Sequence, residues 1–239
     1  MKIIRIALAL FTVLAATLLS GCGPVIIGSG RLVTSNPNLQ GFNNVDISSA
    51  FEFTITRANN FSVTVTADDN IINRVKTTLE GSTLKIDVKP FASLGRATLK
   101  AEIFMPVLGT LSVSGACRGN ISGFNSTIPF VLDASGASKI SGDIASGEAT
   151  IVLSGASIAD ITGTATFLSA DVSGASKLYL SGFAVNNARV NLSGASTGEV
   201  NAAGKLDADL SGASRLTYSG NPAMGNINTS GASTVSRNK

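Results

Sequence analysis

Six charged residues recur at one fixed spacing in the second half of the chain. The acidic set is Asp133, Asp171 and Asp209, and the basic set is Lys139, Lys177 and Arg215. Within each set, successive residues are 38 positions apart. Charged side chains at equal intervals can bind a repetitive polymer such as an envelope glycan, or they can keep a β surface soluble. Because the neighbouring positions carry the apolar residues of alternating segments, we expect all six to point outward as a candidate binding strip.

Residue combinations that support catalysis are not visible in the sequence. The chain has no histidine, which excludes Ser-His-Asp triads, Cys-His dyads and histidine-containing metal sites. Asp68 and Asp69 could form a carboxylate pair for glycoside hydrolysis, but they are adjacent and precede Asn70, which indicates a solvated turn. Neither the charged cluster of a polysaccharide lyase nor the glycine-rich calcium nonapeptide is visible. We therefore expect no catalytic residue, metal or cofactor, and no enzyme.

Cys22 is the residue most suited to covalent modification. It ends the segment Leu19-Ser20-Gly21-Cys22, which resembles the bacterial lipobox. An apolar run at 6–19 precedes it, with the length of a signal-peptide core and too short to span a bilayer. We predict a lipoprotein signal peptide over 1–21 and a lipidated N-terminus and tether over 22–40. Lipid on Cys22 would attach the protein to a membrane.

Charge and the residue after Cys22 give further expectations about location. The chain has 18 basic and 15 acidic residues, and loss of Lys2 and Arg5 with the signal peptide leaves a net charge of +1. A nearly neutral protein argues against nucleic acid as a partner. Gly23 stands where some lipoproteins retained in the inner membrane have aspartate. We expect a location in the cell envelope, with the outer membrane favoured.

A tripeptide repeat organises the C-terminal half. Ser-Gly-Ala begins at Ser114, Ser135, Ser154, Ser173, Ser193, Ser211 and Ser230. Apolar and polar residues alternate on both sides of each copy, which indicates strands. A unit of about 20 residues cannot bury its apolar face alone and must stack on its neighbours. We predict a single-stranded β-helix, or β-solenoid, with rungs of about 19–20 residues; a β-propeller, with about 40 residues per blade, is the competing fold.

The repeat also makes a prediction about its corners. Glycine reaches positive φ without a clash, so Gly174 and Gly194 are expected there, between small residues that stack from rung to rung. Cys117 stands where the other six copies have serine. Because Cys22 would be lipidated, Cys117 has no intrachain disulfide partner. It is either a small residue packed in a corner, or a thiol that is reactive or forms an intermolecular disulfide.

The chain between the tether and the repeats has the same β character. Residues 51–56, 61–66 and 84–88 alternate between apolar and polar positions. No linker separates this N-terminal part, residues 41–106, from the repeats at 107–236. We therefore predict one all-β domain over residues 41–236.

Several motifs in this domain resemble one known family. They are Gly41-Phe42-Asn43-Asn44-Val45, then Leu84-Lys85-Ile86 after a glycine turn, then the Ser-Gly-Ala repeats after Pro106. In this order, over most of residues 30–236, they resemble the head GIN domain family, described as head domains of autotransporter adhesins. The resemblance implies an exported β-solenoid, often with a lipoprotein signal, and it brings no established catalytic residues.

Three functions are compatible with the sequence. The first is a non-enzymatic envelope lipoprotein that presents its solenoid as an adhesin or scaffold to a glycan or protein. The second is a carbohydrate-active β-helix enzyme, which would need a groove with several converging charged side chains. The third is an accessory subunit of an envelope complex, which would expose an apolar strip on one face.

Overall fold

The computed structural model describes residues 25–89 and 94–238. The predicted signal peptide, Cys22 and Gly23 lie outside these residues. Within the described chain, strands predominate and the single helical element is the short 3₁₀ helix η1 (Ile72–Arg74). The predicted all-β class is confirmed.

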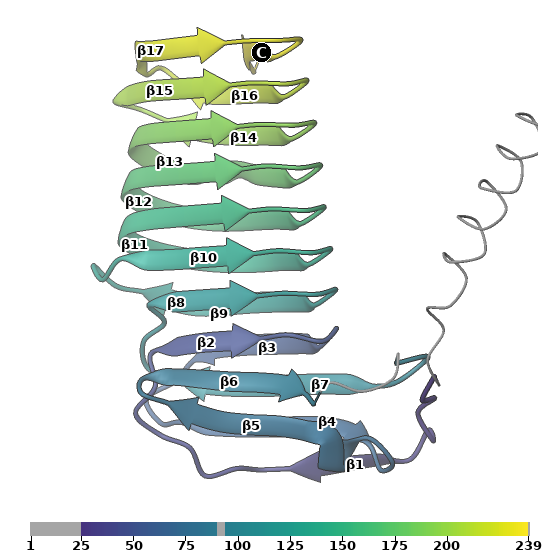
Figure 1. Ribbon diagram of the computed structural model, residues 1–239. Coiled ribbons are helices and arrows are strands. Elements are labelled where there is room, and N and C mark those ends of the chain that lie inside the picture. The colour runs from purple at the N-terminus through teal and green to yellow at the C-terminus, as the bar shows by residue number, and fades with distance from the viewer. Residues whose placement is uncertain (1–24, 90–93, 239) are drawn as a thin grey trace, which may run out of the picture.

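The strands wind into a β-solenoid of about seven turns, with a front row and a back row in Figure 1. The front row contains β6 (Thr83–Val88), β2 (Asn44–Ile47), β8 (Thr110–Val113), β10 (Phe130–Ala134), β15 (Lys205–Leu210) and β17 (Ala223–Thr229). The back row contains β7 (Leu99–Met105), β3 (Glu52–Arg57), β9 (Arg118–Asn125), β14 (Thr197–Ala202), β16 (Arg215–Gly220) and β18 (Thr234–Arg237). Three long strands begin in the back row and end in the front row, namely β11 (Lys139–Leu153), β12 (Ile158–Val172) and β13 (Lys177–Leu192). Strands within each row are parallel, which confirms the predicted solenoid.

The Ser-Gly-Ala segments are the corners that lead from the front row to the back row. The N–H of Ala175 donates to the carbonyl of Gly155 one rung away at 2.7 Å, and the other corners repeat this bond. Gly174 and Gly194 have φ of 74° and 73°, as the repeat predicts. A Cβ atom on Gly174 would lie 2.4 Å from the Gly155 oxygen. Glycine is therefore required here both by its φ and by the closeness of the rung below.

The core lies between the two rows and is filled mainly by aliphatic side chains. In the front row, one buried column contains Leu111, Leu132, Ile151, Ala170, Val190 and Ala208. Stacking of such columns buries apolar area on every rung, and this burial is the main stabilising term of a solenoid. A large side chain in one rung is accommodated by a small residue in the next rung. A Cβ on Gly119 would lie 2.1 Å from the ring of Phe53, which occupies the space beside that glycine.

The N-terminal part joins the same solenoid but in a different order from the chain. The rung made by β6 and β7 lies on one side of β2 and β3, and β8 and β9 lie on the other side. Three antiparallel strands then close this end, which we call the base: β1 (Leu32–Ser35), β4 (Ser62–Asp68) and β5 (Val75–Glu80). Figure 1 shows them below the stack.

The base corrects the prediction of a tether over residues 22–40. Leu32–Ser35 forms β1, which pairs with β4, and Ile26 makes a bridge with Leu94. The glycine-, asparagine- and proline-rich composition suggested a flexible segment, but backbone pairing with β4 depends little on composition. Within the described residues, the chain from Ile26 onward is already tied to the fold.

Candidate binding surfaces

The repeated charged residues form two straight columns on the outside of the solenoid. The front column contains Ser112, Asp133, Val152, Asp171, Asn191, Asp209 and Asn228, paired rung to rung in the front row. The back column contains Arg118, Lys139, Ile158, Lys177, Thr197, Arg215 and Thr234, paired in the same way in the back row. All six predicted charged residues are exposed. The expected outward alignment of Lys139, Lys177 and Arg215 is therefore present.

The two columns lie on different rows, so they do not form one mixed strip. In each rung, a front-column residue comes two positions before the corner serine and its back-column counterpart comes four positions after it. The two residues are thus on opposite sides of the corner. No ion pair joins the columns in the described part of the chain. Within one molecule, the three acidic residues therefore lie on the front row and the three basic residues on the back row.

The front column borders a shallow hollow of about 390 Å³. Its polar lining includes Asp171, Asn191, Asp209 and the corner serines Ser173 and Ser193. The amide of Asn191 donates to a carboxylate oxygen of Asp171 at 2.6 Å. The hollow therefore presents carboxylate, amide and hydroxyl groups side by side.

A second hollow, of about 210 Å³, adjoins the first and contains Arg189, Asp207 and Asp209. Lys205 contacts the Asp207 carboxylate at 2.9 Å, and the N–H of Asn226 donates to it at 2.8 Å. These bonds hold the pKa of Asp207 below its usual value, the hydrogen bond from Lys205 being the main cause. The second hollow therefore presents an ionised carboxylate beside a guanidinium and an amide.

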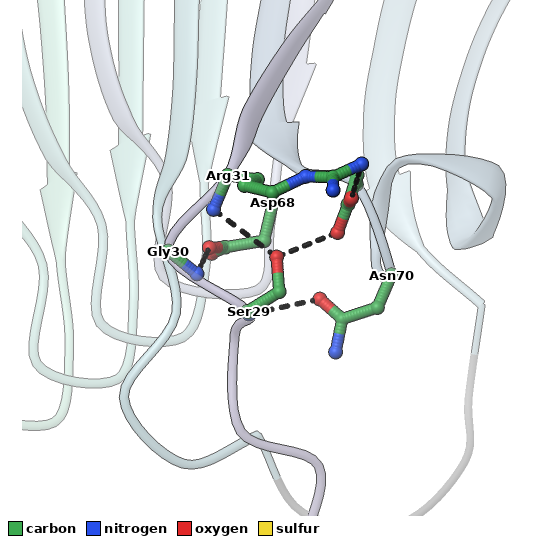
Figure 2. Close-up of polar contacts among 6 residues, drawn as sticks. Ser29, Gly30, Arg31, Asp68 and Asn70 are labelled. Carbon is green, nitrogen blue, oxygen red and sulfur yellow. Dashed lines mark hydrogen bonds and ion pairs between the residues drawn. The ribbon is translucent and has the colours of Figure 1, made fainter.

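Asp68 and Asp69 belong to a structural clip at the base, and Figure 2 shows Asp68 together with Ser29, Gly30, Arg31 and Asn70. The Asp68 side chain is buried, and its two oxygens accept the N–H groups of Gly30 and Thr98, each at 2.7 Å. Burial of Asp68 corrects the expectation that this pair is a solvated turn. Its carboxylate is occupied by backbone donors that join three segments of the chain.

The rest of the clip holds the N-terminal segment from outside. The Ser29 hydroxyl donates to Asp69 at 2.5 Å, and Arg31 lies 3.0 Å from the same carboxylate. The hydrogen bond from Ser29, with help from Arg31, lowers the pKa of Asp69. Asn70 accepts from the N–H of Ser29 and donates to the carbonyl of Ile27 at 2.9 Å. Residues 27–31 are thereby fastened to the end of β4.

Cys117 lies in a corner, fully buried, and its thiol donates to the carbonyl of Ser114 at 3.3 Å. The corner serines of other rungs make the same bond, for example Ser157 to Ser154 at 2.9 Å and Ser196 to Ser193 at 2.9 Å. Burial raises the pKa of the Cys117 thiol. These observations favour the packed corner residue over the reactive thiol.

Sequence reasoning did not identify some of the outward residues that lie beside the columns. Arg189 is in the second hollow, and Glu199 occupies the back row of the same rung. Arg189 comes two residues before Asn191 of the front column, and Glu199 comes two residues after Thr197 of the back column. Arg189 and Glu199 are ten positions apart in the sequence. Only this pair in the repeats has opposite charges at that offset, so no period in the sequence reveals it.

Comparisons with known proteins agree with the fold. The family model described as "Putative auto-transporter adhesin, head GIN domain" matches residues 41–222. A putative adhesin from Bacteroides fragilis is similar with a TM-score of 0.80 and 17% identity, covering 89% of this chain and 99% of that one. A putative lipid binding protein from Parabacteroides distasonis gives 0.71 and 18%, covering 90% and 100%. A putative adhesin from Parabacteroides merdae gives 0.68 and 16%, covering 91% and 100%. No curated protein sequence gave a significant match.

Proposed function

The chain belongs to the head GIN domain family, and from this we propose that it is a non-enzymatic, adhesin-like lipoprotein of the cell envelope. Lipid on Cys22 anchors it, and the solenoid presents its outward columns to an envelope glycan or protein. The outer membrane is the favoured location, on the basis of Gly23.

The single observation that carries this proposal is the fastening of the N-terminal segment to the base. The clip holds Ser29 only seven residues after Cys22. An extended chain of that length reaches at most about 25 Å. A lipid on Cys22 would therefore keep the base close to the membrane surface, and the solenoid would project the rest of its rungs from it.

Exposed aliphatic side chains at the base support the same arrangement. Val25 and Ile27 are 54% and 64% exposed, and Leu32 of β1 is 53% exposed. Exposed apolar side chains on a surface can contact a membrane or another protein. Val25 and Ile27 lie three and five positions after the residue that would carry lipid, and Leu32 lies ten positions after it. They are well placed to rest on the bilayer beside the acyl chains.

The regular outward columns of the remaining surface favour a binding role. Within residues 25–89 and 94–238, no group of three or more His, Cys, Asp or Glu is arranged to hold a metal. No helix in that part of the chain is long and apolar enough to cross a membrane. What the surface does offer is regular, exposed columns on a rigid stack. Such a surface suits recognition of an extended partner.

Replacing Cys22 with serine tests the anchor. We expect the Cys22→Ser protein to be extracted from cells without detergent, because serine cannot form the thioether that holds the diacylglyceryl group. The measurement is fractionation of membranes followed by immunoblotting. Cys117→Ser is the matched control and should stay with the membranes, since its hydroxyl can make the same corner bond as Ser157. A Cys22→Ser protein that still needs detergent would overturn the proposed anchor.

A further inference from the structure

Six of the seven rungs carry chemically matched residues in the front and back columns, and the exception is Ser112 with Arg118. Three rungs carry opposite charges: Asp133 with Lys139, Asp171 with Lys177, and Asp209 with Arg215. One rung carries two branched apolar residues, Val152 and Ile158. Two rungs carry an amide and a hydroxyl, Asn191 with Thr197 and Asn228 with Thr234. Because the members of each pair lie on opposite rows, a single molecule cannot bring the two columns face to face.

The outward positions next to the columns continue the match. Arg189 in the front row and Glu199 in the back row share a rung and carry opposite charges. Neither makes an ion pair within 4.0 Å among the described residues, although Arg189 lies opposite Asp207 in its own row and helps to lower the pKa of that carboxyl. One rung below, the small Ser169 of the front row corresponds to the large Tyr179 of the back row. These two rungs are complementary in charge and in size, respectively, whereas Thr150 with Asp160 and Asp207 with Thr217 are not matched in charge.

The shapes of the two columns also fit together. The front column has short side chains and borders the hollow of about 390 Å³. The back column has long ones, including Lys139, Lys177 and Arg215. Long cationic side chains of one surface can enter a hollow lined by Asp171 and Asp209 on another. The acidic hollow of the front row is thus complementary in charge to the basic residues of the back column.

We propose that the partner for these columns is a second copy of this chain, with the front row of one copy against the back row of the next. Matched residues share a rung, so the two copies stand side by side with no stagger along the axis and with their bases level. Copies anchored in one membrane have that arrangement. The proposal therefore rests on the proposed lipid anchor. Because the two surfaces differ, each copy can bind a neighbour on both sides and form an open row.

The match covers the rungs from Asp133 to Thr234 and ends at the N-terminal rungs of the solenoid. In the two rungs made by β2 with β3 and by β6 with β7, Asp46 corresponds to Glu52, and Lys85 to Lys100, so these rungs carry like charges. Glu52 and Lys100 pair with each other at 3.5 Å, and Lys85 pairs with Glu80 at 2.8 Å. These internal pairs weaken repulsion between copies. The contact is assigned to residues 133–234 only.

The association is expected on a membrane and to depend on salt. Exposed ion pairs each contribute little in water, so free copies should associate weakly. Confinement of anchored copies to one plane raises their effective concentration and makes several weak pairs sufficient. Raising the ionic strength to about 1 M shortens the screening length to about 3 Å and should disperse the rows.

The test uses the lipidated protein in phosphatidylcholine vesicles, with energy transfer between donor-labelled and acceptor-labelled copies. Labels are placed on Ala203→Cys, an exposed position outside both columns. One variant carries Lys139→Glu, Lys177→Glu and Arg215→Glu, and another carries Asp133→Lys, Asp171→Lys and Asp209→Lys. We expect transfer above the random level for the wild-type columns, complete loss of the excess in each triple variant alone, and recovery when the two variants are mixed in equal amounts.

Recovery in the mixture is the discriminating result, because only contact between the two columns predicts it. Arg57→Glu, Lys76→Glu and Lys89→Glu change the same number of charges near the base and should keep the transfer of the wild-type columns. Random transfer for the wild-type columns, or no recovery in the mixture, would overturn the proposal. Flotation of the vesicles first shows whether the protein is anchored, so a failed anchor is distinguished from a failed contact.

Discussion

Gly174→Val is expected to lower the free energy of unfolding by roughly 2–5 kcal/mol, from about 1–2 kcal/mol for a side chain at positive φ and about 1–3 kcal/mol for overpacking. The Gly155 oxygen, 2.4 Å from the new Cβ, is also the acceptor for the N–H of Ala175. Relief of the clash would break that bond and disturb the corner above and below. Urea unfolding monitored by circular dichroism gives the value.

Gly81→Val is the matched control for this substitution. Gly81 lies between β5 and β6 at a φ of 60°, and nothing lies within 4 Å of a Cβ built there. Gly81→Val should therefore lower the free energy of unfolding only by the cost of a side chain at positive φ, about 1–2 kcal/mol. If Gly174→Val loses no more stability than Gly81→Val, the stacking of corners does not require glycine at position 174.

Asp68→Asn should destabilise the base by roughly 1–3 kcal/mol, because the amide group replaces one of two buried acceptors and leaves a backbone N–H facing another donor. The affected donors are the N–H groups of Gly30 and Thr98. Loss of either loosens the segment that leads to Cys22. Limited proteolysis should therefore cut the variant between residues 25 and 31 faster than the wild type.

Asp69→Asn makes the same chemical change at the neighbouring position. Its partners Ser29 and Arg31 are at the surface, where water can replace them. The loss of stability and the gain in cleavage should both be smaller than for Asp68→Asn. Equal effects of the two substitutions would contradict the assignment of Asp68 as the buried centre of the clip.

The repeats were predictable in detail because one sequence pattern determines their geometry. Ser-Gly-Ala at a period near 19 residues fixes the corner, the positive φ of Gly174 and the outward direction of Asp171 and Lys177. Every rung has the same neighbours, so an inference from one copy applies to the others. The same regularity placed each charged set in a straight column.

The base was not predictable because alternation identifies a strand but not its partner or direction. Nothing in the residues of β4 or β5 marks them as antiparallel, and the order β6, β2, β8 requires contacts between segments far apart in sequence. Asp68 beside Asp69 looked solvated because burial of its carboxylate depends on backbone donors of residues 30 and 98. The two charged columns lie on different rows because the chain turns sharply at the Ser-Gly-Ala corner. The spacing of the repeat in the sequence does not show how sharp that turn is.

The similar solved structures and the family model support different conclusions. Identities of 16–18% show the fold alone, whereas the family model covers residues 41–222. The family match begins at residue 41, after Cys22. The proposed membrane anchor therefore depends on the lipobox and on the short reach from Cys22 to the clip.

The mass of the N-terminal peptide, isolated from membranes of the native cells, tests the proposed lipid anchor. We expect a mature chain that starts at Cys22 and carries diacylglyceryl and N-acyl groups, so the peptide should be heavier than its sequence by the mass of those chains. A mature chain that starts at another residue, or an unmodified Cys22, would show that the protein is not anchored in this way.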